Sequence, residues 1–348
     1  MEKSGSRAKI DDVAHLAGVS TKTVSRVLNN EPNVRDATRV KVKEAAEELN
    51  YTPDFSARSL AGQKSYLIAM FYDTAAQGYL SQFQASALVQ CREYGYHLIV
   101  ERCDITAPNG GQELANTAAR LRVDGVVLLP PLSNQTDVLD HLGQTQIPFV
   151  QVAPSETSKA SHFLDMDDAR AAYELTGYLI ALGHRRIGHI MGHPAHGATV
   201  QRYEGYCQAL KDAGLAYEPE LVTEGLFTIS SGETGAEALL SASNPPSAIF
   251  AANDDMAAGA IMRARERGLQ IPRDVSVVGF DDSEIAIVTY PQLTTVRQPI
   301  EGMAGSAIDL LIDAIKTSKS AEVSNATQSR QFGFELIERG SAGRPKPV

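Results

Sequence analysis

Cysteine is scarce in this chain of 348 residues, whose three cysteines, Cys91, Cys103 and Cys207, lie far apart. This spacing gives neither a paired disulfide framework nor a metal cluster of the Cys-x-x-Cys kind. The chain also lacks an apolar run of the roughly 18 to 20 residues that a membrane span needs, and residues 1–9 are polar and basic, with no apolar stretch behind them. These absences predict a cytoplasmic protein that is not anchored in a membrane.

Motifs of the common catalytic sites are absent as well. The sequence contains no Ser-His-Asp order, no Gly-x-Ser-x-Gly elbow, no Walker loop and no Gly-x-Gly-x-x-Gly fingerprint. Two pairs of adjacent carboxylates, Asp254 with Asp255 and Asp281 with Asp282, could suggest glycosidase chemistry. Neighbours on one loop rarely flank a bond from two sides, as that reaction requires, so we do not expect an enzyme.

Basic charge is in short supply overall, but it is unevenly distributed. The net charge is -10, yet residues 1–62 hold ten Lys or Arg against nine Asp or Glu, and the remaining residues hold 22 against 33. An acidic body would be repelled by DNA everywhere except at a near-neutral N-terminal segment. Any contact with nucleic acid is therefore expected within residues 1–62.

A helix-turn-helix pattern occupies residues 10–29, which read IDDVAHLAGVSTKTVSRVLN. Gly18 permits the positive φ of a tight turn between two helices, and Ser20 can cap the second helix. On that helix Thr21, Lys22 and Arg26 share the face opposite the apolar stripe, as in a helix laid in the major groove. The apolar positions of the two helices are Ile10, Val13, Ala14, Leu16, Ala17, Val24, Val27 and Leu28.

A third helical pattern runs from Asp36 to Leu49, and a bare three-helix bundle with solvated charges would give the same pattern. Its expected inward residues are Val40, Ala45, Ala46 and Leu49, and its expected phosphate contacts are Arg39, Lys41 and Lys43. The string DVAHLAGVSTKTVSRVLN, followed by Val34, Thr38 and LNYTPDFSARSLAG, is more specific. It resembles the head of the LacI/GalR family of bacterial transcription regulators over about fifty residues.

The segment after this head has a role that the resemblance implies. Pro53 blocks continuation of the third helix, and the next residues can form a short helix up to Gly62 that is not stable alone. In the family two such hinge helices pair in the minor groove and push a leucine, here Leu60, between base steps. A linker without DNA contact is the alternative. The candidate DNA-binding residues are Ser20, Thr21, Lys22, Thr23, Ser25, Arg26, Asn29, Arg58, Leu60 and Ala61.

Beyond Ser65 short apolar runs alternate with longer amphipathic segments. The expected strands are Tyr66–Phe71, His97–Glu101, Gly125–Leu129, Phe149–Val152, Arg186–Met191, Ala248–Ala251 and Val275–Gly279. The expected helices between them include Tyr79–Tyr94, Asp168–Leu182, Arg202–Ala213, Gly232–Ser241 and Asp255–Arg267. This alternation predicts parallel sheets that are covered by helices on both faces, a doubly wound α/β body.

The body resembles the same family, through strings such as RVDGVVLLPP, LIALGHRRIGHIMG, PPSAIFAANDDMAAGAI and PRDVSVVGFDD. The resemblance implies a periplasmic-binding-protein-like fold of two lobes joined by three crossing strands. It divides the chain into a helix-turn-helix DNA-binding domain at 8–52, a hinge helix at 53–63 and an effector-binding and dimerisation domain at 64–340. No segment is then left for an appended enzyme.

In open α/β sheets the ligand lies beyond the carboxyl ends of the strands, where this chain has polar residues. Forks of Arg, Asp and Asn can bind neighbouring hydroxyls of a sugar, while an aromatic ring covers its apolar face. The candidate effector-binding residues, some from these positions and some from the resemblance, are Asp73, Tyr79, His193, His196, Arg202, Phe227, Asn253, Asp255 and Asp281. Structural roles are the alternatives: an ion pair at a helix start for Arg202, and helix caps for Asp254, Asp281 and Asp282.

Two positions depart from the family pattern. Many members have an aspartate where IPFVQVAPS places Ala153, and many carry Asn-Pro-Phe-Phe where TAAQGYL leaves Tyr79 as the only aromatic residue. The identity of the effector is therefore left open.

Histidines are concentrated in one stretch, GHRRIGHIMGHPAHG, which holds His184, His189, His193 and His196. A metal site is one interpretation, but a mid-strand His189 and a preceding His184 need not converge. His193 and His196 follow the strand in a loop, so contact with the effector is the preferred interpretation, and we expect no metal and no cofactor.

The resemblance implies a homodimeric repressor of carbohydrate uptake or catabolism genes, which binds an inverted-repeat operator and leaves it when a small carbohydrate binds. A corepressor would use the same cleft with the opposite preference. The alternatives are a sugar-binding protein whose head has lost DNA binding, and a carbohydrate enzyme.

Overall fold

The computed structural model describes residues 8–28, 34–51, 64–73, 77–104, 106–107, 109–155, 162–318 and 327–346. The chain forms two compact units, Met1–Ser65 and Tyr66–Val348, which we call the head and the body. All of the predicted hinge helix, residues 53–63, lies outside the described residues. No helix of the described residues is long and apolar enough to cross a membrane.

The head contains the predicted helix-turn-helix. Its helices are α1 (Ile10–Ala17), α2 (Thr21–Leu28) and α3 (Asp36–Glu48). Gly18 has a φ of 64°, and the hydroxyl of Ser20 accepts a hydrogen bond from the backbone N–H of Thr23 at 3.2 Å, so both predictions about the turn are confirmed. Val13, Val24, Val27 and Val42 are fully buried where the three helices meet.

Two residues that the apolar pattern had assigned to this core are exposed instead. The exposed fraction is 53% for Val40 and 44% for Leu16. On α3 the buried stripe begins at Val42 and continues through Ala45 and Ala46, at steps of three and four residues, which leaves Val40 on another face. The prediction of an inward Val40 was wrong because one apolar residue does not fix the phase of a helix.

The first lobe of the body has a parallel six-stranded sheet in the order β11-β5-β4-β3-β1-β2. Its strands are β1 (Leu67–Tyr72), β2 (His97–Arg102), β3 (Gly125–Leu128), β4 (Phe149–Val152), β5 (His162–Met166) and β11 (Ser329–Phe332). Helices α5 (Gln77–Glu93) and α13 (Ile300–Thr317) pack on one face. Helices α6 (Gly110–Leu121) and α7 (Thr136–Gln144) pack on the other.

The second lobe has a parallel four-stranded sheet in the order β7-β6-β8-β9. The strands are β6 (Ile187–Ile190), β7 (Val222–Thr223), β8 (Ala248–Ala251) and β9 (Ser276–Val278). Helices α8 (Asp168–Ala181) and α9 (Gly197–Asp212) cover one face, and α10 (Ile229–Leu240) and α11 (Asp254–Glu266) cover the other. A short helix, α12 (Glu284–Val288), follows β9. The doubly wound prediction is confirmed for both lobes.

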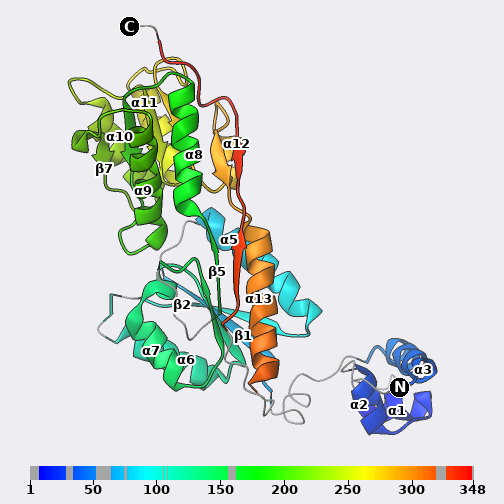
Figure 1. Ribbon diagram of the computed structural model, residues 1–348. Helices are drawn as coiled ribbons and strands as arrows, with labels where there is room; N and C mark the ends of the chain where they lie inside the picture. The colour runs from blue at the N-terminus through cyan, green and yellow to red at the C-terminus, as the bar shows by residue number, and fades with distance from the viewer. Residues whose placement is uncertain are drawn as a thin grey trace, which may run out of the picture. The chain divides into compact units, whose positions relative to one another are not determined.

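The chain crosses between the lobes three times (Figure 1). It passes from β5 to α8, from β10 (Thr295–Arg297) to α13, and from β11 to β12 (Glu335–Ile337). Strands β10 and β12 pair with each other antiparallel and form a separate two-stranded sheet. Each lobe is therefore completed by segments that are distant in the sequence.

Candidate functional site

A cleft in the body is lined by residues of both lobes and has an empty volume of about 510 Å³, including space open to solvent. The described residues that line it are Tyr79, Pro130, Ala153, Asp168, His196, Ala198, Arg202, Phe227, Asn253, Asp281 and Gln298. Six of the nine candidate effector residues line the cleft.

Arg202 lies on α9, lines the cleft and is buried. Its Nε donates to Oδ1 of Asp168 at 2.7 Å, and its Nη1 donates to the carbonyl oxygen of Ala252 at 2.5 Å. Nη1 also lies 4.0 Å from Oδ1 of Asp281, and the guanidinium stacks 3.6 Å from the ring centroid of Phe280. Because α9 begins at Gly197, the predicted position of this arginine at a helix start was wrong.

Asp281 follows β9 with a φ of 121°, a backbone conformation that side-chain-bearing residues rarely adopt. Its N–H donates to the carbonyl of Val296 at 2.8 Å, and its Oδ1 accepts from Nε2 of Gln298 at 2.6 Å. Burial raises the pKa of Asp281 to about 7, although the charge of Arg202 opposes the rise. Burial also raises the pKa of Asp168, against the opposing effect of the same arginine.

The aromatic wall of the cleft is Phe227, whose φ is 58°. Its ring lies against Gly192, because a Cβ built on Gly192 would come within 2.0 Å of the ring. The ring of His196 meets it edge-on, with centroids 5.2 Å apart. Nδ2 of Asn253 donates to the carbonyl of Phe227 at 3.2 Å, so the asparagine holds the backbone of the aromatic residue.

Asn253 also caps α11, since its Oδ1 accepts from the N–H of Met256 at 2.9 Å. The prediction of Asp254 as the cap was therefore wrong. Asp254 instead accepts from the N–H and hydroxyl of Ser283 at 2.8 and 3.1 Å and from the hydroxyl of Thr295 at 2.6 Å. This buried carboxylate ties the loop after β9 to the crossing strand β10.

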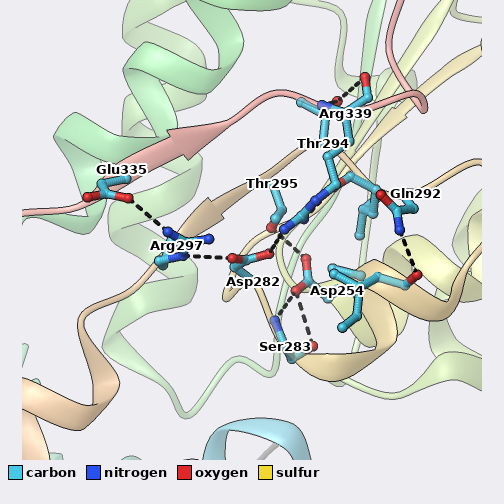
Figure 2. A network of polar contacts seen from close by, with 12 residues as sticks. Asp254, Asp282, Ser283, Gln292, Thr294, Thr295, Arg297, Glu335 and Arg339 are labelled. Carbon is cyan, nitrogen blue, oxygen red and sulfur yellow. Dashed lines mark hydrogen bonds and ion pairs between the residues drawn. The ribbon is translucent and has the colours of Figure 1, made fainter.

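Asp282 belongs to the same network of polar contacts (Figure 2). One carboxylate oxygen lies 2.7 Å from Nε of Arg297 on β10, and the other lies 2.6 Å from Nη2 of Arg339, which follows β12. Arg297 also reaches Glu335 on β12 at 3.0 Å. Asp281 and Asp282 thus place one carboxylate in the cleft and the next one on the two crossing strands.

Three of the predicted effector residues, Asp73, His193 and Asp255, are not among the described residues that line the cleft. Asp73 is buried at the end of β1, and Asp255 is half-buried in the first turn of α11. His193 lies in the predicted loop, and its ring packs against that of His196. The Ala153 position of the family pattern does line the cleft, with a φ of 45°.

The prediction missed four lining residues, Pro130, Asp168, Ala198 and Gln298. Asp168 follows β5 and Gln298 follows β10, two strands that were not predicted. The rule that placed Asp281 after its strand would have found both residues once these strands were recognised.

The histidines of the dense stretch have separate environments. His189 is fully buried among the rings of Tyr203, Tyr206 and Phe250, and burial lowers its pKa to about 4. His184 contacts the hydroxyl of Ser247 and the carbonyl of Gly343. Within the described part of the chain, no group of three or more potential ligands could hold a metal ion.

On the head, α2 carries an exposed polar face. Thr21, Lys22 and Arg26 are exposed, and Val24 and Val27 on the opposite side are fully buried. Thr23 and Ser25 are half-buried. Ser20 is exposed just before α2, and the remaining candidate DNA-binding residues, Asn29, Arg58, Leu60 and Ala61, lie outside the described residues.

Two family models match the chain. The model of bacterial regulatory proteins of the lacI family matches residues 9–54, and that of the periplasmic binding protein-like domain matches residues 176–342. The probable HTH-type transcriptional repressor ExuR of Bacillus subtilis (strain 168) is 34% identical over 311 residues, which are 88% of this chain and 91% of that protein.

Solved structures agree with this assignment. A complex of the transcriptional regulator CelR with cellobiose has a TM-score of 0.73 and 31% identity. A lac repressor dimer bound to operator and the anti-inducer ONPF has a TM-score of 0.78 and 26% identity. Each alignment covers 97% of this chain and 100% of the other. The chain therefore belongs to the LacI family of bacterial regulatory proteins and is a DNA-binding transcription regulator, not an enzyme.

Proposed function

We propose that this regulator is a homodimeric repressor that binds an inverted-repeat operator in the cytoplasm and leaves it when a small sugar-like molecule occupies the cleft. The observation that carries the proposal is the juxtaposition of Arg202, Asp281 and Phe227 in one cleft between the lobes. Side chains with two hydrogen-bonding atoms can bind neighbouring hydroxyls of a sugar, and an aromatic ring beside them can cover its apolar face. The similarity to the CelR-cellobiose complex supports the same ligand class.

The DNA-binding part of the proposal rests on α2. Its exposed Lys22 and Arg26 are suited to base edges and phosphates in the major groove. A single helix of eight residues makes few contacts, so specificity requires two heads on two half-sites. The similarity to the operator-bound lac repressor dimer supports this geometry.

The body has an exposed apolar face against which a second copy of the chain can pack. Met262 of α11, Ile287 and Val288 of α12, and the following Tyr290 are large apolar residues with exposed fractions of 48%, 51%, 69% and 79%. Exposed apolar side chains gathered on neighbouring elements are typical of protein interfaces. We assign this surface, the α11–α12 face, to pairing with an identical chain.

Effector control follows from linkage between the two sites. A ligand that prefers one arrangement of the lobes shifts the dimer toward it, and DNA binding changes by the same factor in return. We propose induction, in which ligand and operator oppose each other, and carbohydrate uptake or catabolism genes as the targets. A corepressor would reverse the sign of the coupling.

The test is selection of binding sites from random and genomic DNA by the full-length protein at physiological salt, with washes that contain single sugars. The expected result is a palindromic site that one sugar releases. Lys22→Ala and Arg26→Ala should each weaken binding by about 1 to 3 kcal/mol, and Lys211→Ala on the exposed surface of α9 serves as the charge-matched control. Failure to enrich any sequence at low and physiological salt, with the sugars also tried as corepressors, would overturn the DNA-binding part of the proposal.

A further inference from the structure

The cleft holds more acidic than basic side chains before any ligand enters. Arg202 is the one lysine or arginine among the described lining residues, whereas Asp168 and Asp281 are both acids. All three side chains are buried. The Nε of Arg202 binds Asp168 at 2.7 Å and its Nη1 lies 4.0 Å from Asp281, so two carboxylates share one guanidinium.

A carboxylate or phosphate on the ligand would therefore meet an unfavourable field. Nη1 of Arg202 is also engaged by the carbonyl of Ala252, and the face of its guanidinium is covered by Phe280. Repulsion from Asp168 and Asp281 would be poorly screened, because salt screens buried charges much less than exposed ones. Among the described lining residues, no second arginine or lysine could compensate for the added negative charge.

Uncharged hydroxyls suit the same surroundings. A hydroxyl can donate to a carboxylate oxygen and accept from an N–H, and it brings no net charge. Phe227, Pro130, Ala153 and Ala198 supply an apolar wall for the C–H faces of a ring. We infer that the cleft selects an uncharged, hydroxyl-rich effector and excludes the carboxylate and phosphate derivatives of the same sugar. This inference rests on the proposed function, because it takes the cleft to be the effector site.

The protonation of Asp281 gives the inference a pH signature. Burial raises the pKa of Asp281 to about 7. A ligand hydroxyl that donates to the carboxylate favours its ionised form, whereas an anionic ligand favours the protonated form. The affinity for a neutral sugar should therefore fall from pH 8 to pH 6, and that for an anion should rise. The charged, titratable and hydrogen-bonding groups around Asp281 are Arg202 of α9, Asp168 of α8, Asp254 and Asp255 of α11, Tyr79 of α5, and Gln298 after β10.

The experiment is titration calorimetry of the full-length protein with matched sets of ligands at pH 6, 7 and 8. The sets are glucose, galactose and mannose, each with its uronate and its 6-phosphate, together with ribose and ribose 5-phosphate, and cellobiose with its aldonate. We expect at least one neutral sugar to bind and its anionic derivatives to bind at least 100-fold more weakly. We also expect its affinity to fall severalfold between pH 8 and pH 6.

A uronate, aldonate or phosphate that binds as tightly as its neutral parent would overturn the inference but leave the proposed function standing. Absence of binding by every member would count against both. Asp281→Asn should reduce the ratio of the affinity for the neutral sugar to that for its anion at least tenfold. It should also remove the pH dependence of the affinity for the neutral sugar. Asp313→Asn, on the exposed surface of α13, should preserve both. The pH series on the unmodified protein tests the inference even if the Asp281 variant does not fold.

Discussion

Phe227 and Gly192 illustrate how single residues determine the shape of the cleft. The phenylalanine has a left-handed backbone conformation, with a φ of 58°, and its ring occupies the space that a side chain at residue 192 would need. The family resemblance suggested Phe227, but nothing in the sequence indicated its partner. Close approach of a ring to a glycine depends on the tertiary fold and leaves no periodic signal.

Gly192→Ala should damage the cleft with little change elsewhere. The new methyl group would lie 2.0 Å from the ring of Phe227, so the ring must shift from its observed position in the wall of the cleft. We expect a loss of effector affinity of about tenfold, equivalent to about 1.4 kcal/mol, and a loss of stability of about 1 to 3 kcal/mol. Calorimetry with the bound sugar and urea unfolding measure the two effects.

The control for this variant is Gly177→Ala on α8, because no atom lies within 4 Å of the methyl group that it adds. Alanine is the better helix former, so this change should stabilise the body by roughly 0.5 to 1 kcal/mol. Equal effects of the two variants on effector affinity would contradict the role assigned to the ring.

Asp281 also makes stability depend on pH. Its pKa in the folded state, about 7, is above its ordinary value of 3.8, so between these values the folded state binds more protons than the unfolded state. The contribution of this carboxyl group to stability is therefore fully present at low pH and decreases as pH rises toward 7. Asp281→Asn removes that dependence.

The free energy of unfolding of Asp281→Asn, relative to the unmodified protein, should accordingly increase from pH 5 to pH 7, by at most about 1.4 kcal/mol per pH unit. Denaturant unfolding at half-unit intervals measures the difference. Asp313→Asn should give a much flatter difference, since this carboxylate is exposed and pairs with Lys316. If the free energy of unfolding of Asp281→Asn relative to the unmodified protein instead decreases as pH rises, the pKa of Asp281 is not raised by folding.

At the scale of helices and strands, the sequence predicted the elements that carry continuous apolar runs. Two of the seven predicted strands have the observed bounds, Phe149–Val152 and Ala248–Ala251, and the other five differ by one residue at one or both ends. Strands β5, β7, β10, β11 and β12 were not predicted. They are short, and β11 reads SRQF with mostly exposed side chains, so periodicity could not distinguish them from loops. Apart from β7, which lies at the edge of the second sheet, these strands cross between the lobes or lie beside a crossing, so the sequence pattern is weakest where the lobes join.

Asp282→Asn tests the network that joins these strands. The side chain of Asp282 is 7% exposed and holds Arg297 and Arg339 together, and removal of its charge leaves Arg339, itself 14% exposed, without that partner. Asparagine tolerates the φ of 55° at this position, so the backbone should be preserved. We expect a loss of stability of about 2 to 4 kcal/mol.

Urea unfolding measures this loss, and the exposed pair of Asp313 and Lys316 supplies the control. Asp313→Asn removes an ion pair whose two side chains are 58% and 61% exposed, and should cost below about 1 kcal/mol. Comparable losses of stability for the two variants would mean that the contacts of Asp282 with Arg297 and Arg339 contribute no more than an exposed ion pair.

The whole molecule is proposed to act as a dimer through the α11–α12 face. Val288→Asp places a charge on a side chain that is 69% exposed, which a monomer tolerates but an apolar interface does not. We expect the dimer dissociation constant to rise at least about tenfold and operator affinity to fall with it. Sedimentation velocity and operator titration measure the two quantities.

Val200→Asp on α9 is the matched control, since Val200 is 50% exposed and lies on a different helix. A Val288→Asp protein that remains dimeric at the same concentration would place the pairing surface elsewhere on the body.

The three crossings between lobes also determine the order in which the protein can fold as it is made. The head is an independent unit within the first 65 residues. The first lobe, by contrast, lacks the buried face of α13 and the edge strand β11 until the ribosome has reached Phe332. At roughly 5 to 20 residues per second, that interval lasts tens of seconds or less. A nascent chain therefore completes the residues of its head well before those of its effector site, and the proposed dimer, which pairs through the body, can form only later still.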